Sequence, residues 1–420
     1  FKKWIDMGAP WPKSNEPQIV KSDGIDFEKF RNQHWSLKPI LNPVPPEVAN
    51  TPWLRNPIDK FILARLEAAK MKPAQVASRR TLIRRAYFDL IGLPPSPESV
   101  AAFVVGDMTW DHVIEELLAS PQYGERWARH WMDVARYSDG LGGFLDNRGL
   151  PNAWQYRDFV VNAFNEDVPF DQFVRWQIAG ELTPNAPLLA RAGTGFFAVG
   201  PTYNGDGGDA EASAAARAET LSDRVDTFSR AFLGLTVACA RCHDHKFDPV
   251  SIKDYYAIAG VFNNTSIADK PLASDTIVKS YDNHQNKIKN IEKQIKQLND
   301  KVKKEKREIN EDEKKKRDKW TKDRDELRKS LPPKYATAHG LRENGSNNMH
   351  VAIRGDLRKK GEEVPRRFLE VISRDKTFNK KSGLLQLAES VVDRDNPLTS
   401  RVFVNRVWQW HFGRAIVRTP

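Results

Sequence analysis

Hydrophobic residues recur at helical spacing along most of the chain between residues 56 and 262. The first predicted helix begins at Asn56-Pro57, because asparagine caps a helix and proline fits its first turn. Further helices are predicted over residues 80–91, from residues 96 and 109, and over residues 121–137, 154–164, 170–178, 217–233 and 252–262. Trp127 and Trp131 fall on the periodic face of one helix, which predicts that they are core residues. The pattern therefore predicts a mainly α-helical protein with a multi-helix body.

Residues 283–331 have a different pattern, which predicts an antiparallel coiled-coil hairpin projecting from the body. In the first half, apolar residues alternate three and four positions apart, as a coiled-coil seam requires. They are Ile288, Ile291, Ile295, Leu298 and Val302. The residues 309–312 break this pattern, and the second half carries Trp320 and Leu327 on one side.

The regions outside these helices are predicted from their turn residues. Prolines dominate residues 22–51, which predicts an extended linker. Residues 193–208 are rich in glycine but lack the Gly-Lys-Ser/Thr ending of a phosphate loop, so we expect a flexible loop there. Residues 349–356 alternate like a strand, residues 361–369 are typical of a loop, and Asn396-Pro397 begins a last helix that ends at Gly413. We therefore expect a small mixed α/β part at the C-terminal end.

Composition and charge restrict the function classes. The chain has 420 residues, 40% of them hydrophobic and 29% charged, which is typical of a globular protein. The sequence contains no run of about 18 apolar residues, so no membrane-spanning helix is predicted. The net charge is +11, but residues 287–329 hold 18 basic and 11 acidic residues and thus supply most of that excess. Aromatic residues do not alternate with these lysines, so we expect a solvated charged surface and no nucleic-acid partner.

Both cysteines of the chain lie in one short motif, Cys239-Ala-Arg-Cys242-His243. Two thiols at this spacing can bond the two vinyl groups of one porphyrin, and the histidine that follows is then an axial ligand of the iron. The motif predicts haem c, with Cys239 and Cys242 as the thioethers and His243 as the proximal ligand. Two alternatives remain. A redox dithiol would sit in a βαβ unit, which is not predicted here, and a closed zinc site with His243 or His245 would need a fourth ligand.

The helix predicted over residues 121–137 carries a polar stripe beside its tryptophans. Its members are Arg126, His130, Asp133, Arg136 and Asp139. A solvated face with internal ion pairs is one interpretation. The other is a polar wall around the haem, in which Arg126 and Arg136 bind propionates and His130 or Met132 approaches the distal side of the iron. Met132 can equally fill core space, as methionine usually does.

Several motifs together carry a family resemblance. They are Gly124-Glu-Arg-Trp-Ala-Arg-His-Trp-Met-Asp-Val-Ala-Arg-Tyr137, the Cys-Ala-Arg-Cys-His-Asp-His-Lys-Phe-Asp-Pro block, Asp254-Tyr-Tyr256, Arg354-Gly-Asp356 and Asn396-Pro-Leu-Thr-Ser-Arg-Val-Phe-Val-Asn-Arg-Val-Trp408. The chain resembles the planctomycete cytochrome c-like (PSCyt) and PSD domain proteins over nearly its whole length. The resemblance implies that residues 1–21 are the tail of an upstream cytochrome c-like domain, residues 52–282 a PSCyt-type domain and residues 332–420 an incomplete PSD-type domain.

The motif and the resemblance together predict a periplasmic or secreted c-type haem protein. We expect it to act in electron transfer or haem-dependent oxidation linked to polysaccharide catabolism, as an oxidoreductase or as a redox partner of a catabolic enzyme. Its expected partners are a redox protein or the upstream cytochrome domain, together with a substrate derived from a polysaccharide. The alternative is an extracellular carbohydrate-binding or hydrolytic module in which the Cys/His cluster holds a structural metal.

Overall fold

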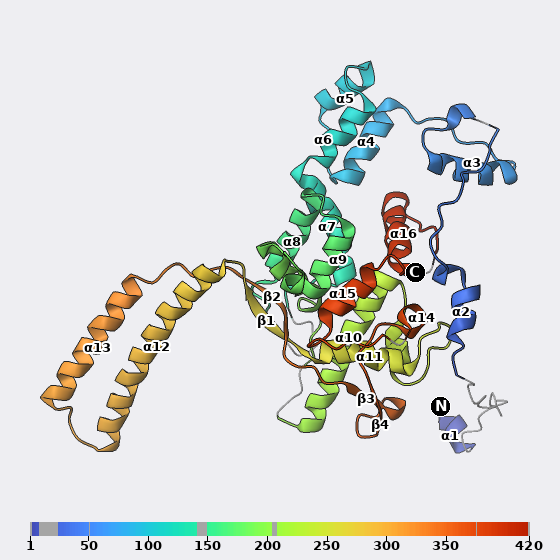
Figure 1. Cartoon of the computed structure of the whole chain (residues 1–420). Coiled ribbons are helices and arrows are strands. Elements are labelled where there is room, and N and C mark those ends of the chain that lie inside the picture. The colour runs from blue at the N-terminus through green and yellow to red at the C-terminus, as the bar shows by residue number, and fades with distance from the viewer. Residues whose placement is uncertain are drawn as a thin grey trace. The chain divides into compact units, whose positions relative to one another are not determined.

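The computed structural model describes residues 2–7, 24–49, 51–140, 149–203, 208–374 and 376–418. In these ranges the protein is mainly helical and has two small antiparallel two-stranded sheets (Figure 1). The predicted fold class is confirmed in its helical part. The chain forms two compact units from separate stretches of sequence, residues 1–68, 221–264 and 346–420 in unit 1 and residues 69–220 and 265–345 in unit 2. The domain limits predicted along the sequence stay predictions.

Helices capped by serine and threonine form much of unit 2. Ser78, Ser96 and Thr109 each accept a hydrogen bond from a backbone N–H in the first turn of the helix that follows, which fixes where these helices begin. These three helices are α4 (Arg79–Leu90), α5 (Pro97–Val105) and α6 (Trp110–Leu118). They are followed by α7 (Pro121–Ala135), α8 (Ala153–Asn165) and α9 (Phe170–Ala179), which begin without a side-chain cap. The short 3-10 helices η3 (Gly180–Leu182) and η4 (Leu188–Phe197) follow.

The core of unit 2 is aromatic, as the tryptophan pattern predicts. Trp131 is fully buried and meets the edge of Phe173 at 5.0 Å between ring centroids, and Phe173 stacks on Phe159 at 6.0 Å. The prediction of a flexible glycine loop is wrong for residues 193–197, which belong to the buried helix η4. Gly193 is required there, because a Cβ at this position would lie 2.2 Å from the carbonyl oxygen of Trp176.

The coiled-coil hairpin is inserted between the two strands of one ladder in unit 2. Strand β1 (Thr265–Pro271) pairs antiparallel with β2 (Thr337–Glu343), and α12 (Asp275–Lys304) and α13 (Glu311–Lys329) lie between them in sequence and side by side in Figure 1. The first helix begins eight residues before the predicted start at 283, because Ser274 caps it. An ion pair of 2.6 Å between Glu292 and Arg328 shows that the two helices run antiparallel. The sequence pattern did not predict β1 and β2.

Unit 1 is assembled from three stretches of the chain. The first holds α1 (Lys2–Asp6), α2 (Phe27–Gln33), η1 (Trp35–Leu37), η2 (Thr51–Trp53) and α3 (Pro57–Ala68). The second holds the end of α10 (Ala210–Leu233), η5 (Val237–Arg241) and α11 (Ile252–Asn263), and the third holds β3 (Met349–Ala352), η6 (Ile353–Gly355), β4 (Lys360–Val364), α14 (Glu370–Ser373), α15 (Leu384–Val392) and α16 (Leu398–Phe412).

Two sequence predictions for unit 1 need correction. The linker predicted as extended contains α2, because Asp26 caps that helix by accepting from the backbone N–H of Lys29 at 2.9 Å. The stretch predicted as a loop at 361–369 begins with β4, whose Val364 pairs with Met349 of β3. Part of the predicted tail at 1–21 lies outside the described residues.

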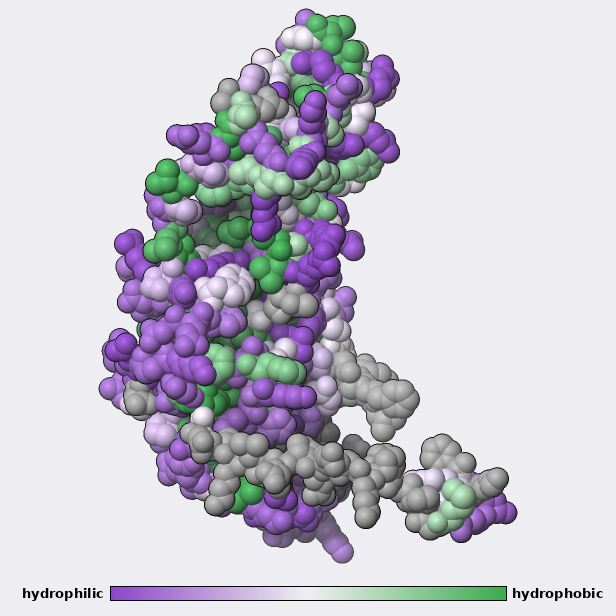
Figure 2. All heavy atoms as spheres, turned by 90° about the vertical axis from the view of Figure 1, so that its right-hand side faces the viewer, coloured by the Kyte–Doolittle hydropathy of each residue, from purple (hydrophilic) through white to green (hydrophobic). Residues whose placement is uncertain are grey.

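The surface drawn in Figure 2 carries its hydrophobic side chains in separate groups among hydrophilic ones.

A buried ion pair holds the second and third stretches of unit 1 together. The side chain of Asp254, on α11, has no solvent exposure, and its Oδ1 accepts from Nη1 of Arg367 at 2.5 Å and from the backbone N–H of Glu370 at 2.9 Å. Its Oδ2 accepts from the backbone and the hydroxyl of Ser251, both at 2.8 Å, so both carboxylate oxygens are fully used.

Arginines bind backbone carbonyls at the other joints of unit 1. Arg31, on α2, donates to the carbonyls of Val371 and Glu370. Arg401, on α16, donates to the carbonyls of Ser36 and Lys38 in the first stretch of the chain.

Arg406, also on α16, donates to the carbonyls of Arg230 and Ala231 in the last turn of α10. Burial lowers the pKa of Arg406 to about 10, so at neutral pH it is still a cation at the negative end of the α10 dipole. These bonds satisfy carbonyls that helix ends leave open.

Replacing the buried carboxylate tests this arrangement. Asp254→Asn should lower the free energy of unfolding by about 3–5 kcal/mol, because it leaves Arg367 buried with one carboxylate fewer. Urea unfolding followed by circular dichroism measures the change. The matched control is Asp226→Asn, which breaks an exposed pair with Arg230 and should cost less than about 1 kcal/mol. Equal effects of the two substitutions would show that the Asp254 pair does not hold unit 1 together.

Candidate functional site

The two cysteines and the histidine of the Cys-x-x-Cys-His motif are exposed in unit 1. Cys239 lies within η5, whose first turn is closed by the hydrogen bond from the Cys239 N–H to the carbonyl of Thr236 at 2.9 Å. Cys242 follows η5 directly, and neither cysteine is in a disulfide. His243 is also exposed. All three side chains are therefore accessible to a reagent or a cofactor from solvent.

A hydrogen bond sets the ring orientation of His243. Its Nδ1 lies 2.7 Å from the backbone carbonyl of Asp244, and a carbonyl can only accept, so Nδ1 carries the hydrogen. In the neutral ring Nε2 then holds the lone pair and is the atom available to a metal ion or haem iron. Metal-binding histidines commonly donate their other N–H to a backbone carbonyl in this way.

His245 has a structural role instead. Its Nδ1 accepts from the backbone N–H of Asp248 at 2.8 Å and of Phe247 at 3.2 Å, so the hydrogen is on Nε2, which donates to the hydroxyl of Thr236 at 2.9 Å. Both ring nitrogens are thus used to close the loop that follows the motif. The zinc alternative with His245 as a ligand would have to break these bonds.

Two hydrogen bonds join the Cys-x-x-Cys-His segment to helix α11. The carboxylate of Asp244 accepts from the backbone N–H of Ile252, the first residue of α11, at 2.8 Å. The hydroxyl of Tyr256 donates to the carbonyl of Arg241 at 3.2 Å and lies 3.5 Å from that of Ala352. Burial raises the pKa of Tyr256, so this hydroxyl keeps its proton and remains a donor. The motif is therefore tied to both α11 and β3.

The turn after β3 packs against one of the two exposed thiols. Arg354 and Gly355 both have positive φ, of 55° and 77°, and a Cβ on Gly355 would lie 2.7 Å from Sγ of Cys242. Only glycine allows this approach without displacing the sulfur. Cys242 is thus in van der Waals contact with a segment more than 100 residues further along the chain.

Exposed apolar side chains occur on the two segments that form the site. Phe247 is 75% exposed and follows the motif, and Ile353, in the turn that contacts Cys242, is 47% exposed. These two side chains are therefore open to solvent on the segments that carry and contact the motif.

The other predicted site residues lie on or next to α7, in unit 2. His130 meets the ring of Trp127 edge-on at 5.6 Å, and Met132 is half-buried. A Cβ on Gly92 would lie 3.0 Å from Cδ of Arg126, and one on Gly200 would lie 2.9 Å from Nη2 of Arg136. Arg126, His130 and Arg136 thus have packing contacts within unit 2, and their prediction as a haem wall stays a prediction.

The described ranges contain no group of three or more His, Cys, Asp and Glu side chains that could hold a metal ion. Within the same ranges, no helix has the length and apolar composition needed to cross a membrane.

Sequence reasoning gave Tyr256 and Gly355 only as members of the family motifs, and it did not single out His350. Tyr256 contacts the Cys-x-x-Cys-His motif through its hydroxyl and Gly355 approaches it through its backbone, at positions that only the fold brings together. His350, on β3, is exposed, and its Nδ1 donates to the carbonyl of Gly361 at 3.1 Å, which leaves Nε2 open in the same way as in His243. The strand-like alternation of residues 349–356 was the one signal that could have drawn attention to it.

Comparison with known proteins gives two family matches. The model named PSCyt2, described as a protein of unknown function (DUF1549), matches residues 57–267, about half of the chain. The model named PSD1, described as a protein of unknown function (DUF1553), matches residues 384–420. No curated protein and no solved structure matches the chain. The turn at 353–356, which contacts Cys242, lies outside both matched segments.

The contact between Gly355 and Cys242 can be tested by substitution. Gly355→Ala should lower the free energy of unfolding by about 1–3 kcal/mol more than Gly413→Ala, because both strain a positive φ but only the first also pushes against a neighbour. Denaturant unfolding of the two variants measures the difference.

A double substitution separates this contact from other effects. Adding Cys242→Ala to Gly355→Ala removes the sulfur and should recover most of the extra loss. If Cys242→Ala and Gly355→Ala are simply additive, the turn does not pack on the thiol.

Proposed function

Because this chain belongs to the PSCyt2 family, whose match covers the whole Cys-x-x-Cys-His motif, we propose that it is a c-type haem protein acting in electron transfer or haem-dependent oxidation. One observation carries the proposal. Two exposed thiols on one turn are followed by an exposed histidine whose Nδ1–H is held by a backbone carbonyl, leaving Nε2 open.

The residues of the motif fit haem c. Cys239 and Cys242 would hold the porphyrin through thioethers, and His243 would be the proximal ligand through Nε2. Bound haem would supply one-electron chemistry at its iron. Phe247 and Ile353 offer exposed apolar surface on the two segments of the site, as a porphyrin face requires.

The surrounding residues would keep the ligand set in place. The Asp244 carbonyl holds the His243 ring, and the Asp244 carboxylate and the Tyr256 hydroxyl hold the backbone on either side of Cys242. A ligand whose orientation is fixed before binding loses less conformational entropy on binding. These hydrogen bonds would therefore favour one position of the iron ligand.

Location and partners form part of the same proposal. We propose that the protein is periplasmic or secreted. Its proposed partner is a redox protein or a cytochrome domain, and its proposed substrate derives from a polysaccharide. The alternative function with a Cys/His structural metal gains no support from the described residues, where His245 is already fully hydrogen-bonded.

Substitution of the motif tests haem attachment. After expression in a host that matures c-type cytochromes, the native chain should retain haem on a denaturing gel and give a pyridine haemochrome spectrum. Cys239→Ser with Cys242→Ser should abolish both signals, because no other thiol exists in the chain.

The matched control is His243→Ala, which keeps both thiols. It should retain covalent haem but show a shifted Soret band, because the proximal ligand is lost. Haem that stays bound to the double serine variant in the denaturing gel, or native chain with no haem at all, would contradict the proposal.

The distal side of the iron gives a second test. We expect an open or water-bound distal site, and hence a high-spin or mixed-spin ferric spectrum that shifts when cyanide or imidazole is added. Met132→Leu should leave this spectrum unchanged, since a methionine on a helix usually fills core space. A native spectrum that is fully low-spin and insensitive to both ligands would exclude the open site, and its change in Met132→Leu or His350→Gln would identify the distal ligand.

A further inference from the structure

The coiled-coil hairpin α12–α13 has an apolar seam that its two helices do not cover completely. Of the five seam residues of α12, Ile288 alone is buried, at 5% exposure, whereas Ile291, Ile295, Leu298 and Val302 are half-buried. No residue of α13 is buried. Arg317 and Arg324 are among its half-buried residues, next to Trp320 and Leu327. The hairpin thus keeps partly exposed apolar residues along one side.

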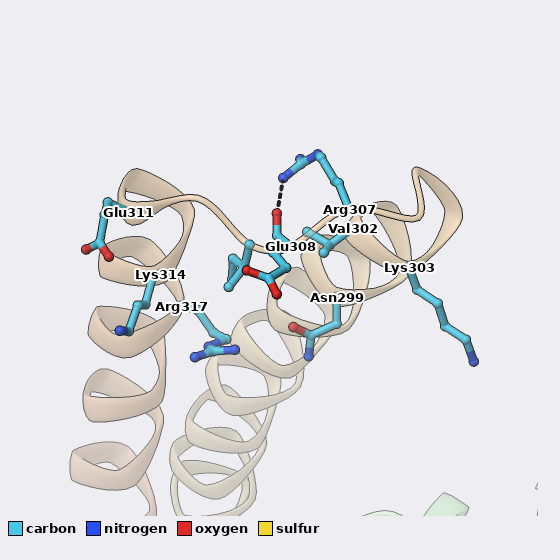
Figure 3. Close-up of a pocket in the computed structure, with 9 residues that line it drawn as sticks. Asn299, Val302, Lys303, Arg307, Glu308, Glu311, Lys314 and Arg317 are labelled. Atoms are coloured by element: carbon cyan, nitrogen blue, oxygen red, sulfur yellow. Dashed lines mark hydrogen bonds between the residues drawn. The ribbon is translucent and has the colours of Figure 1, made fainter.

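A cavity of about 550 Å³ lies at the tip of the hairpin, between the two helices (Figure 3). Val302 and Ile309 supply apolar atoms to its lining. Its charged lining residues are Lys303, Arg307, Lys314, Arg317, Glu308 and Glu311. The lining thus carries four positively and two negatively charged side chains.

The tip is held in one conformation by its own contacts. Arg307 donates to both carboxylate oxygens of Glu313 at 2.7 Å, to Glu305 at 2.6 Å and to the carbonyl of Glu308 at 3.0 Å. Asn310 and Glu313 form a reciprocal capping box at the start of α13. The hydrogen bonds from Arg307 lower the pKa of Glu313 to about 2, so this carboxylate stays ionised at any physiological pH. These contacts join the loop at the tip to the first turn of α13.

Arg307 is neutralised by Glu313 and Glu305, which do not line the cavity. The remaining charged lining residues are Lys303, Lys314 and Arg317 against Glu308 and Glu311, an excess of one positive charge. Lys303 and Lys314 form no ion pair with any described residue. Figure 3 shows Arg317 reaching from α13 toward the space between the helices. Among the described residues, the guanidinium of Arg317 pairs only with the exposed Asp318, at a distance of 3.7 Å. Such a surface attracts carboxylates.

We infer that the hairpin is a docking site for an acidic amphipathic helix of a partner protein. The apolar stripe of that helix would lie on Ile291, Ile295, Leu298 and Val302, which completes the seam as a third helix does in a bundle. Its carboxylates would meet Lys314 and Arg317 at the tip. A second copy of the hairpin is a poor occupant, because residues 287–329 carry 18 basic and 11 acidic residues and two copies would repel each other.

A designed peptide probes this surface on the full 420-residue chain. The probe is a fluorescein-labelled helical peptide of about four heptads, with Leu at the seam positions and Glu beside them, and fluorescence anisotropy gives its Kd. We expect saturable binding. The same peptide with Lys in place of Glu, or with Ser in place of Leu, should bind at least about tenfold more weakly, because charge or apolar contact is then lost.

Two charge-matched variants of the chain locate the binding. Lys314→Glu with Arg317→Glu alters cavity residues, and Lys315→Glu with Lys316→Glu alters exposed neighbours outside the cavity by the same net charge. The first pair should weaken binding about tenfold or more, and the second by less than about threefold. Circular dichroism checks that both variants stay helical.

Several results would overturn the inference. They are the absence of peptide binding, an equal loss in the two variants, and equal affinity of the Glu and Lys peptides. Single-stranded DNA of the same charge that binds as tightly as the Glu peptide, with the same preference between the two variants, would identify a polyanion surface instead. None of these measurements depends on haem.

Discussion

The buried pair of Asp254 and Arg367 is the interaction on which unit 1 depends. Burying two charges costs several kcal/mol unless their hydrogen-bonding capacity is used, and here Asp254 accepts four hydrogen bonds while Arg367 also reaches Glu370 and the Phe368 carbonyl. The pair fixes the start of α11. That helix in turn holds the Cys-x-x-Cys-His turn, since its first N–H binds Asp244 and its Tyr256 binds the Arg241 carbonyl. The site is therefore built on a rigid helix by residues distant in sequence.

The helices could be predicted from sequence because the signals that start them are local. Three helices begin directly after a capping residue, which is Asn56, Ser96 or Thr109. A cap depends only on a backbone N–H two or three positions further along the chain. The strands β1 and β2 could not be predicted in this way, since Ala268 pairs with Gly340 across the whole inserted hairpin. A strand that is partly polar and has its partner 72 positions away has no periodic signal of its own.

The same distinction applies to the site. Cys239, Cys242 and His243 lie close together in sequence, so the prediction of a haem c site could be made from their spacing alone. The residues that complete the site are not adjacent. The backbone of Gly355 approaches the sulfur of Cys242, and the hydroxyl of Tyr256 lies near two carbonyls, those of Arg241 and Ala352, on different segments. Neither contact follows from local sequence. The role of His245 also required the structure. The sequence alone does not distinguish a histidine that binds a metal from one that closes the loop after the motif.

The hydrogen bonds of the two histidines also bear on which group the motif binds. An open Nε2 on His243 would suit zinc as well as haem iron, so this tautomer alone does not separate the two. A closed zinc site needs four ligands, however. The next two candidate donors in sequence are already engaged: an Asp244 carboxylate oxygen accepts from the backbone N–H of Ile252, and His245 uses both ring nitrogens to hold Thr236 and the 247–248 backbone. Haem needs no fourth donor from this loop, because the porphyrin supplies four nitrogens itself. The loop geometry that removes His245 from the ligand set therefore favours the porphyrin over the bare ion.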